Sequence, residues 1–126
     1  MKILDTCVWI EATLATATGK RYERLLHDTE QLIMPTLVCY ELRRWALREY
    51  GFKHADKLQA GLQAMALAPL DILIALRAAD LADIYKLSTA DAIIYATALR
   101  HNAELVTCDA HFKGLPSVDY TPKIAP

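Results

Sequence analysis

Short apolar runs alternate along the chain with longer stretches in which apolar residues recur every three to four positions. The short runs predict strands, and the longer stretches predict helices. Proline, glycine and helix-capping residues separate the two kinds of segment. The expected strands cover residues 2–4, 31–34, 66–70, 104–107 and 117–120, and the expected helices cover residues 8–14, 20–26, 36–49, 54–66, 72–85 and 88–100.

This alternation of strands and helices predicts an α/β fold with a parallel sheet. Because crossovers between parallel strands are right-handed, helices should cover both faces of the sheet. We therefore expect a three-layer sandwich, with a central parallel sheet of about four to five strands flanked by helices, in a single domain of residues 1–126. Ligands of such sheets bind at the carboxyl ends of the strands.

Composition narrows the class of protein. The chain has 14 Lys and Arg against 15 Asp and Glu, so its net charge of −1 argues against general electrostatic binding of nucleic acid. A local basic rim around an acidic site remains compatible with this balance. No run approaches the roughly 18 apolar residues that cross a membrane, and acidic residues interrupt the apolar N-terminus, so neither a membrane span nor a signal peptide is expected.

The three cysteines, Cys7, Cys39 and Cys108, show no repeated spacing. An odd number without a pattern argues against a disulfide framework and favours reduced thiols in the cytoplasm. Each cysteine lies within two residues of an acidic residue discussed below. A zinc site with His111 is conceivable, but the chain lacks the paired Cys-x-x-Cys spacing that would support it. Surface placement is the expectation for His111.

Four acidic residues share one expected location. Asp5 ends the first strand, and Asp109 follows the fourth strand after one intervening residue. Glu41 and Asp91 lie on helices that should begin near the same edge of the sheet, and both border the apolar face of their helix. Clustered carboxylates repel one another unless a proton or a cation neutralises them. A hard divalent cation prefers such oxygen ligands and supports phosphodiester hydrolysis.

Each of these acids also has a structural alternative. The three aspartates could cap helices or begin turns. Glu41 could be a solvated helix residue that pairs with Arg44 or Arg48. Basic runs at positions 20–24 and 43–48 could guide phosphates, and Trp9, Tyr40 and Trp45 could stack on bases, although solvated helix faces and core packing are the commoner roles.

Four sequence blocks, in this order, resemble those of PIN domains and, more narrowly, of VapC-type toxin ribonucleases of toxin–antitoxin systems. The blocks are Ile3-Leu4-Asp5-Thr6, Pro35-Thr36-Leu37-Val38-Cys39-Tyr40-Glu41-Leu42, Ser88-Thr89-Ala90-Asp91-Ala92-Ile93-Ile94 and Leu105-Val106-Thr107-Cys108-Asp109-Ala110-His111-Phe112. Any one block is weak evidence for the family. The four blocks in this order span nearly the whole chain and together make a strong signal. One departure is Cys7, where the family often has Ser or Asn.

The resemblance implies a Mg²⁺-dependent endoribonuclease, with Mn²⁺ as a possible substitute. It assigns catalysis and metal binding to Asp5, Glu41, Asp91 and Asp109. Thr6 and Thr107 match the family's hydroxyl positions, which would orient carboxylates or bound water. The implied partners are an RNA substrate, a second copy of the chain in a homodimer, and an antitoxin protein that blocks the site, often with a basic side chain.

We therefore predict a cytoplasmic toxin that arrests translation by cutting a structured RNA such as tRNA. One alternative is a PIN nuclease of RNA processing that is not a toxin. Another is an inactive PIN-like module that only binds a partner, although retention of all four acids argues against it. A receiver-type signalling domain also clusters acids at a sheet edge, but it would require a lysine after a late strand, and residues 104–112 contain none.

Overall fold

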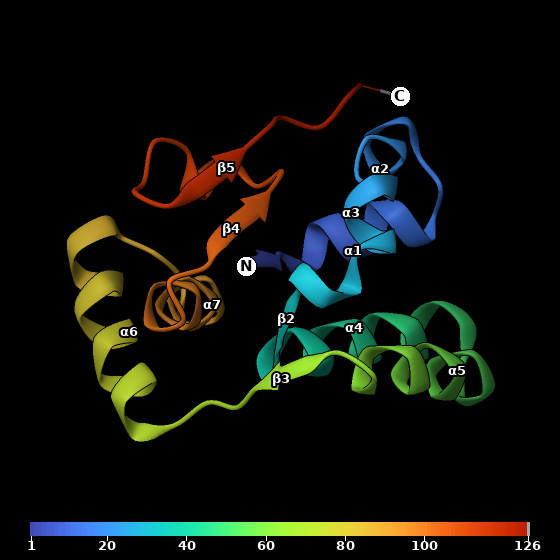
Figure 1. Cartoon of the computed structure of the whole chain (residues 1–126), viewed down its shortest axis with the longest axis horizontal. Helices are drawn as coiled ribbons and strands as arrows, with labels where there is room; N and C mark the ends of the chain where they lie inside the picture. The colour runs from blue at the N-terminus through green and yellow to red at the C-terminus, as the bar shows by residue number, and fades with distance from the viewer. Residues whose placement is uncertain (126) are drawn as a thin grey trace.

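A computed structural model describes residues 1–125 and shows a parallel sheet with helices on both sides (Figure 1). Strand β1 (Lys2–Leu4) pairs with β4 (Glu104–Thr107), which pairs in turn with β5 (Val118–Tyr120). A second ladder joins β2 (Ile33–Pro35) to β3 (Ala66–Ala68). A parallel bridge between Lys2 and Leu32 connects the two ladders. The resulting order is β3-β2-β1-β4-β5, and every pairing is parallel.

The central strands are buried on both faces, as their apolar sequences predicted. Successive residues of β1 point to opposite faces, so Ile3 packs in one apolar cluster and Leu4 in another. In β4, Leu105 and Val106 divide in the same way. The sheet therefore separates two cores, which makes the molecule the expected three-layer α/β sandwich.

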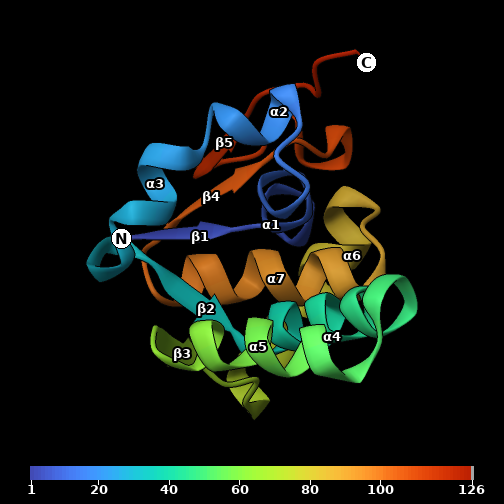
Figure 2. The same cartoon turned by 90° about the vertical axis from the view of Figure 1, so that its right-hand side faces the viewer.

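The helices divide between these two cores. Helices α1 (Thr6–Thr13), α2 (Ala17–Lys20) and α3 (Glu23–His27) lie together at one side of β1 and β4 (Figure 1). Helices α4 (Thr36–Tyr50) and α5 (Phe52–Gln63) form an antiparallel pair, and α6 (Ile72–Tyr85) packs on α7 (Thr89–Arg100). Figure 2 shows α7 running alongside the sheet between β4 and the α4–α5 pair. Short 3-10 turns, η1 (Thr29–Gln31) and η2 (Ala110–Phe112), complete the order.

The helix predicted for residues 20–26 is wrong in its first half, because Lys20 ends the separate helix α2 and a turn precedes α3 (Glu23–His27). Thr16 caps α2, its hydroxyl accepting from the Gly19 amide at 3.0 Å. The Tyr22 amide then donates to the Gly19 carbonyl at 3.0 Å, which closes a turn and ends α2. Tyr22 is buried in the core with Leu4 and Val106, so side-chain packing redirects the chain at a point where the polar pattern predicted continuity.

Two sequence signals place the later helices correctly. Asp71 accepts a hydrogen bond from the Ile74 amide at 2.9 Å and begins α6 at the expected residue. Gly51 has φ of 89°, a conformation that favours glycine, and it separates α4 from α5. Within residues 1–125, no helix has both the length and the apolar character needed to cross a membrane.

Candidate active site

The carboxyl ends of β1 and β4 lie side by side and set the position of two acids. Leu4 pairs with Val106 at the ends of the two strands, and the Asp5 amide donates to the Val106 carbonyl at 2.9 Å. Asp5 therefore leaves β1 at the point where β4 continues toward Asp109. This adjacency follows from the parallel pairing of strands that are about a hundred residues apart in the chain.

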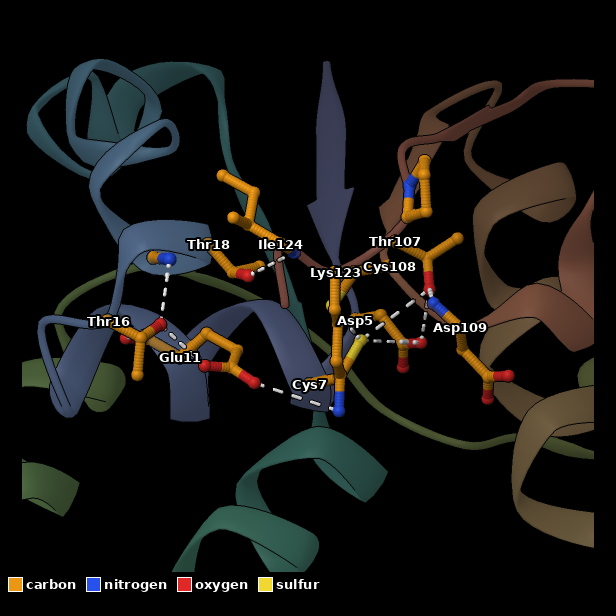
Figure 3. Close-up of polar contacts among 12 residues, drawn as sticks. Asp5, Cys7, Glu11, Thr16, Thr18, Thr107, Cys108, Asp109, Lys123 and Ile124 are labelled. Atoms are coloured by element: carbon orange, nitrogen blue, oxygen red, sulfur yellow. Dashed lines mark hydrogen bonds and ion pairs between the residues drawn. The ribbon is translucent and has the colours of Figure 1, made fainter. Parts of the chain in front are cut away.

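Asp5 is a buried carboxylate, with 4% of its surface exposed. Its Oδ1 accepts from the Thr6 amide at 2.8 Å, so the residue also caps α1. Its Oδ2 accepts from the Thr107 hydroxyl at 2.8 Å, and the Cys7 Sγ lies 3.6 Å from the same oxygen. Figure 3 shows these side chains converging from β1, α1 and the end of β4. Both carboxylate oxygens are thus held in a fixed orientation.

Glu41 reaches the site from the second turn of α4. Its Oε1 accepts from the Thr6 hydroxyl at 2.7 Å, which joins α4 to the first turn of α1. Glu41 borders the buried stripe of Val38 and Leu42, so the helix holds its carboxylate against the sheet edge. The ion pair with Arg44 or Arg48 considered from the sequence is not formed among the described residues.

Asp91, Asp109 and His111 form the third part of the site. The Nδ1 atom of His111 lies 2.9 Å from Asp109 Oδ1 and 3.9 Å from Asp91 Oδ2. One ligand atom from each of the three lies within 4.8 Å of the others. Asp109 also receives support from Thr107, whose hydroxyl accepts from the Asp109 amide at 2.9 Å. The same threonine therefore contacts both Asp5 and Asp109.

The charges of the four acids act on one another. The pKa of Asp5 is raised from 3.8 to about 6, mainly by burial and to a smaller extent by the negative charge of Asp91, against the hydrogen bonds from Thr107, Thr6 and Cys7. The pKa of Asp91 is raised mainly by burial and then by the charges of Asp109 and Glu41, while Ser88 and His111 oppose the increase. Mutual repulsion of this kind shows that the four carboxylates occupy one electrostatic neighbourhood.

These donors fit a hard divalent cation. Four carboxylates and one imidazole offer mainly oxygen ligands, which Mg²⁺ and Mn²⁺ prefer. A buried Asp5 with a raised pKa is energetically costly as an anion, and a cation would offset that cost. The cluster of possible metal ligands found among residues 1–125 consists of Asp91, Asp109 and His111 and includes none of the cysteines considered for zinc.

The capping roles considered from the sequence are present in the structure beside the cluster of acids. Ser88 caps α7 by accepting from the Asp91 amide at 3.3 Å, and Asp109 caps η2 by accepting from the His111 amide at 2.9 Å. Sequence reasoning placed His111 on the surface, and it is exposed, but its ring turns back onto the acids. The signal was its position two residues after Asp109, where a tight turn brings the two side chains together.

The surface beside Glu41 is basic and hollowed. A depression of about 320 Å³ is lined by Thr6 and Glu41 and by residues of α4 that include Tyr40, Arg44 and Arg48. Tyr40 is 56% exposed, whereas Trp45 is largely buried and contributes only to the wall of the hollow. Arg44 and Arg48 form a local basic rim at this hollow, which is compatible with the net charge of −1 for the whole chain.

Comparison with known proteins identifies the family. The PIN domain model matches residues 2–117, and the chain belongs to the PIN domain family. A search of curated proteins finds no match to this sequence. The family assignment therefore rests on the domain model, and it agrees with the sequence resemblance and with the α/β sandwich.

Solved structures show the same fold. A toxin–antitoxin complex from Klebsiella pneumoniae contains a chain that is 25% identical, with a TM-score of 0.82 over 94% of this chain and 96% of that chain. FitAcB from Neisseria gonorrhoeae is 24% identical, with a TM-score of 0.74 over 95% and 96% of the two chains. VapC20 from Mycobacterium tuberculosis, a sarcin-ricin loop cleaving toxin, is 16% identical, with a TM-score of 0.75 over 92% and 95%.

Proposed function

We propose that this protein is a Mg²⁺-dependent endoribonuclease and the toxin of a type II toxin–antitoxin pair. The observation that carries the proposal is the convergence of Asp5, Glu41, Asp91 and Asp109 at the carboxyl ends of β1 and β4. Membership of the PIN family and similarity to solved toxins support the same activity. The proposed substrate is a structured RNA such as tRNA, whose cleavage would arrest translation.

The four acids would hold the divalent cation, with Mn²⁺ as an alternative to Mg²⁺. When bound, such a cation acidifies water and neutralises charge on a phosphate. Thr107 and Thr6 orient Asp5 and Glu41 through their hydroxyl groups. His111 lies beside Asp109 and Asp91 at the solvent side, where its imidazole can donate a hydrogen bond to a phosphate oxygen.

The antitoxin partner is proposed to occupy a groove between α4 and α5. This groove has a volume of about 430 Å³ and a mainly apolar lining that includes Leu47, Leu58 and Leu62. It shares Tyr40 and Arg44 with the hollow beside Glu41. A partner segment seated in the groove could therefore extend a basic side chain to the carboxylates. The Klebsiella pneumoniae chain, a relative of similar length, is part of a toxin–antitoxin complex.

A homodimer is proposed through the outer face of α6. Ile72, Leu76 and Ile84 are 68%, 61% and 64% exposed on this face, which is a large apolar surface for a small chain. Burying it against a second copy would remove this surface from water. We place the protein in the cytoplasm, because three cysteines without a disulfide framework suit a reducing compartment.

Cleavage of total cellular RNA tests the proposed activity. Purified protein free of antitoxin is incubated with RNA in Mg²⁺ or Mn²⁺, and the fragment ends are sequenced. We expect discrete fragments that disappear in EDTA and in the Asp5→Asn variant, because that change removes one charge from the cation site while keeping the shape of the side chain. Asp119→Asn, an exposed acid on β5, is the matched control and should cleave normally.

Folded Asp5→Asn protein that cuts as fast as the parent chain would remove Asp5 from the catalytic set. Absence of cleavage by folded, metal-supplemented parent protein would favour an inactive PIN-like binding module. Cleavage products confined to precursor RNA would instead indicate a processing nuclease.

A further inference from the structure

Two cysteine sulfurs meet directly behind Asp5. The Sγ atoms of Cys7 and Cys108 are 3.0 Å apart, although the residues are separated by 101 positions in the chain. Cys7 is in the first turn of α1, and Cys108 directly follows β4. Figure 3 shows both side chains beside Asp5 at the meeting point of the two strands. The activity proposed above uses neither thiol as a reacting group, and Cys7 touches the site only through its contact with Asp5.

The backbone around this pair is fixed on both sides. Leu4 pairs with Val106, and the Asp5 amide donates to the Val106 carbonyl at 2.9 Å. The two sulfurs are therefore held together by the sheet and not by a flexible loop. A disulfide requires about 2.05 Å between sulfurs, so the pair must close by roughly one ångström.

The pair also has an entry point for reagents. Cys7 is only partly buried, whereas Cys108 is buried with 5% exposure. Cys7 is thus the sulfur that a reagent meets first, and Cys108 is the neighbour that can displace it. Cys39 provides an internal contrast, because it is also a free, partly buried thiol but lies on α4, in the wall of the α4–α5 groove.

We propose that Cys7 and Cys108 form a reversible disulfide whose formation weakens the cation site at Asp5. In the reduced protein, Cys7 lies 3.6 Å from Asp5 Oδ2 and can donate its S–H hydrogen to that oxygen. In the disulfide Cys7 has no S–H hydrogen, and its sulfur is drawn toward Cys108. Asp5 Oδ2 then keeps only the Thr107 hydroxyl as a side-chain donor. Loss of a group that orients a ligating carboxylate lowers metal affinity.

The reaction needs a low-molecular-weight disulfide such as oxidised glutathione. The Cys7 sulfur bonds to one half of that disulfide, its S–S bond breaks, and the other half leaves as a thiol with the proton that Cys7 loses. Cys108 then attacks the Cys7 sulfur and displaces the second half, which leaves with the proton of Cys108. Two protein thiols are oxidised, and one small disulfide is reduced to two thiols.

Thiol counting in glutathione buffers tests disulfide formation without reference to activity. The full chain is equilibrated at increasing ratios of oxidised to reduced glutathione, free thiols are alkylated, and peptides are mapped by mass spectrometry. We expect loss of two thiols together, a Cys7–Cys108 linked peptide, and complete reversal by dithiothreitol. Cys39→Ser should keep this behaviour. Cys108→Ser and Cys108→Ala should abolish the linked peptide, and thermal melting confirms that each variant is folded.

Mn²⁺ titration of the two forms tests the connection to Asp5. Paramagnetic resonance of free Mn²⁺ should show about tenfold weaker binding by the disulfide form of the parent chain, and no difference between oxidising and reducing conditions in Cys7→Ala, which has no thiol beside Asp5 to lose. Three free thiols at every glutathione ratio, or a mixed glutathione adduct on Cys7 without the linked peptide, would overturn the proposal. Equal Mn²⁺ affinity in both forms would overturn the weakening of the site.

This inference depends on the proposed function only for its consequence in RNA cleavage. If the disulfide forms and Mn²⁺ binding weakens but neither form cuts RNA, the nuclease proposal fails while the redox inference stands. If reduced protein cuts RNA but the thiols never pair, the nuclease proposal stands and the redox inference fails.

Discussion

The pKa of Asp5 depends on its burial, on repulsion from Asp91 and on the hydrogen bonds that its carboxylate accepts. Burial raises its pKa to about 6, while Thr107, Thr6 and Cys7 stabilise the anion in part. A folded chain without cation therefore binds a proton at Asp5 over a pH range in which the unfolded chain does not. This difference makes folding stability depend on pH.

We expect the stability of the metal-free parent chain, measured relative to Asp5→Asn, to fall as pH rises from 4 to 7. Between pH 3.8 and about 6 the folded state holds the Asp5 proton and the unfolded state has lost it, so the stabilising contribution of the neutral form is lost through this range. A shift of about two pKa units corresponds to about 3 kcal/mol. Urea denaturation in EDTA at several pH values measures this difference.

Other titrating groups are present in both proteins, so their effects largely cancel in the comparison. A difference in free energy that stays constant from pH 4 to 7 would contradict the account of Asp5 by burial. Adding Mn²⁺ at pH 7 should restore stability to the parent chain more than to Asp5→Asn, since the cation offsets the buried charge.

Thr107 is the residue that couples two of the acids, and its replacement should affect both stability and activity. Thr107→Val removes the donor to Asp5 Oδ2 and the acceptor for the Asp109 amide. Leaving these buried groups without a partner should lower the free energy of unfolding by about 1–3 kcal/mol. We also expect weaker Mn²⁺ binding and slower RNA cleavage, measured by titration and by initial rates.

Thr97→Val is the matched control, because Thr97 is also buried but donates only to the Ile93 carbonyl within its own helix. It should cost less than about 1 kcal/mol and leave Mn²⁺ affinity intact. Equal effects of the two substitutions on Mn²⁺ affinity would show that Thr107 contributes only to packing.

The carboxyl ends of the expected strands were a better guide to where the acids lie than the chemistry of any single residue. Asp5 and Asp109 could be placed at one edge because parallel strands share their carboxyl side, and the structure brings them there. The position of His111 could not be predicted, because it depends on the tight geometry of η2. The contact between Cys7 and Cys108 depends in the same way on the rotamers of two residues beyond the strands.

At the scale of elements, the junction of α1 and α2 requires a glycine. A Cβ on Gly19 would clash with the backbone carbonyl of Glu11 and the Cα of Ala12. Backbone atoms cannot rotate away as a flexible side chain can. We expect Gly19→Ala to destabilise the chain by about 3 kcal/mol as α1 and α2 separate, measured by urea denaturation.

Gly61→Ala tests the opposite situation on α5. Nothing lies within 4 Å of a Cβ added at Gly61, and the residue is exposed in a helix. Alanine should therefore stabilise the protein by about 0.5–1 kcal/mol through its higher helix propensity. Similar effects of the two substitutions would contradict close packing of α2 on α1.

Helix boundaries were predictable where a local signal was present. Asp71 and Gly51 mark their helix ends by side-chain capping and by backbone conformation, respectively, so the sequence contains the information. The break at Arg21 and Tyr22 has no comparable local signal. It arises because Tyr22 enters the core beneath β1 and β4, and this long-range packing overrides the helical pattern of residues 20–26.

At the scale of the whole molecule, the outer face of α6 should determine oligomeric state. We expect Leu76→Arg to convert a homodimer into a folded monomer, because it places a charge in the middle of the apolar face. Light scattering coupled to size exclusion measures the mass. Phe52→Arg, which alters an exposed aromatic residue on α5, should leave the dimer intact. A monomeric parent chain at micromolar concentration would contradict the proposed interface.

The sheet topology could be predicted from the alternation of strands and helices and from the right-handed crossovers between them. The exposed surfaces of the helices could not. Five short apolar runs and right-handed crossovers leave few arrangements, and the observed sheet is one of them. Sequence periodicity could not show which apolar residues of α6 remain exposed, because that depends on where α7 packs. The α4–α5 groove likewise arises from the angle between two helices.

Strand β4 is synthesised after the segments that contain Asp5, Glu41 and Asp91. It pairs with β1, and it positions Asp109 opposite an acid from the beginning of the chain. A growing chain on the ribosome therefore contains Asp5, Glu41 and Asp91 before Asp109 has been added and the four acids can come together. Incomplete translation products that stop before β4 would lack β4, β5 and the fourth acid. The proposed nuclease activity would therefore begin only after synthesis has passed residue 109.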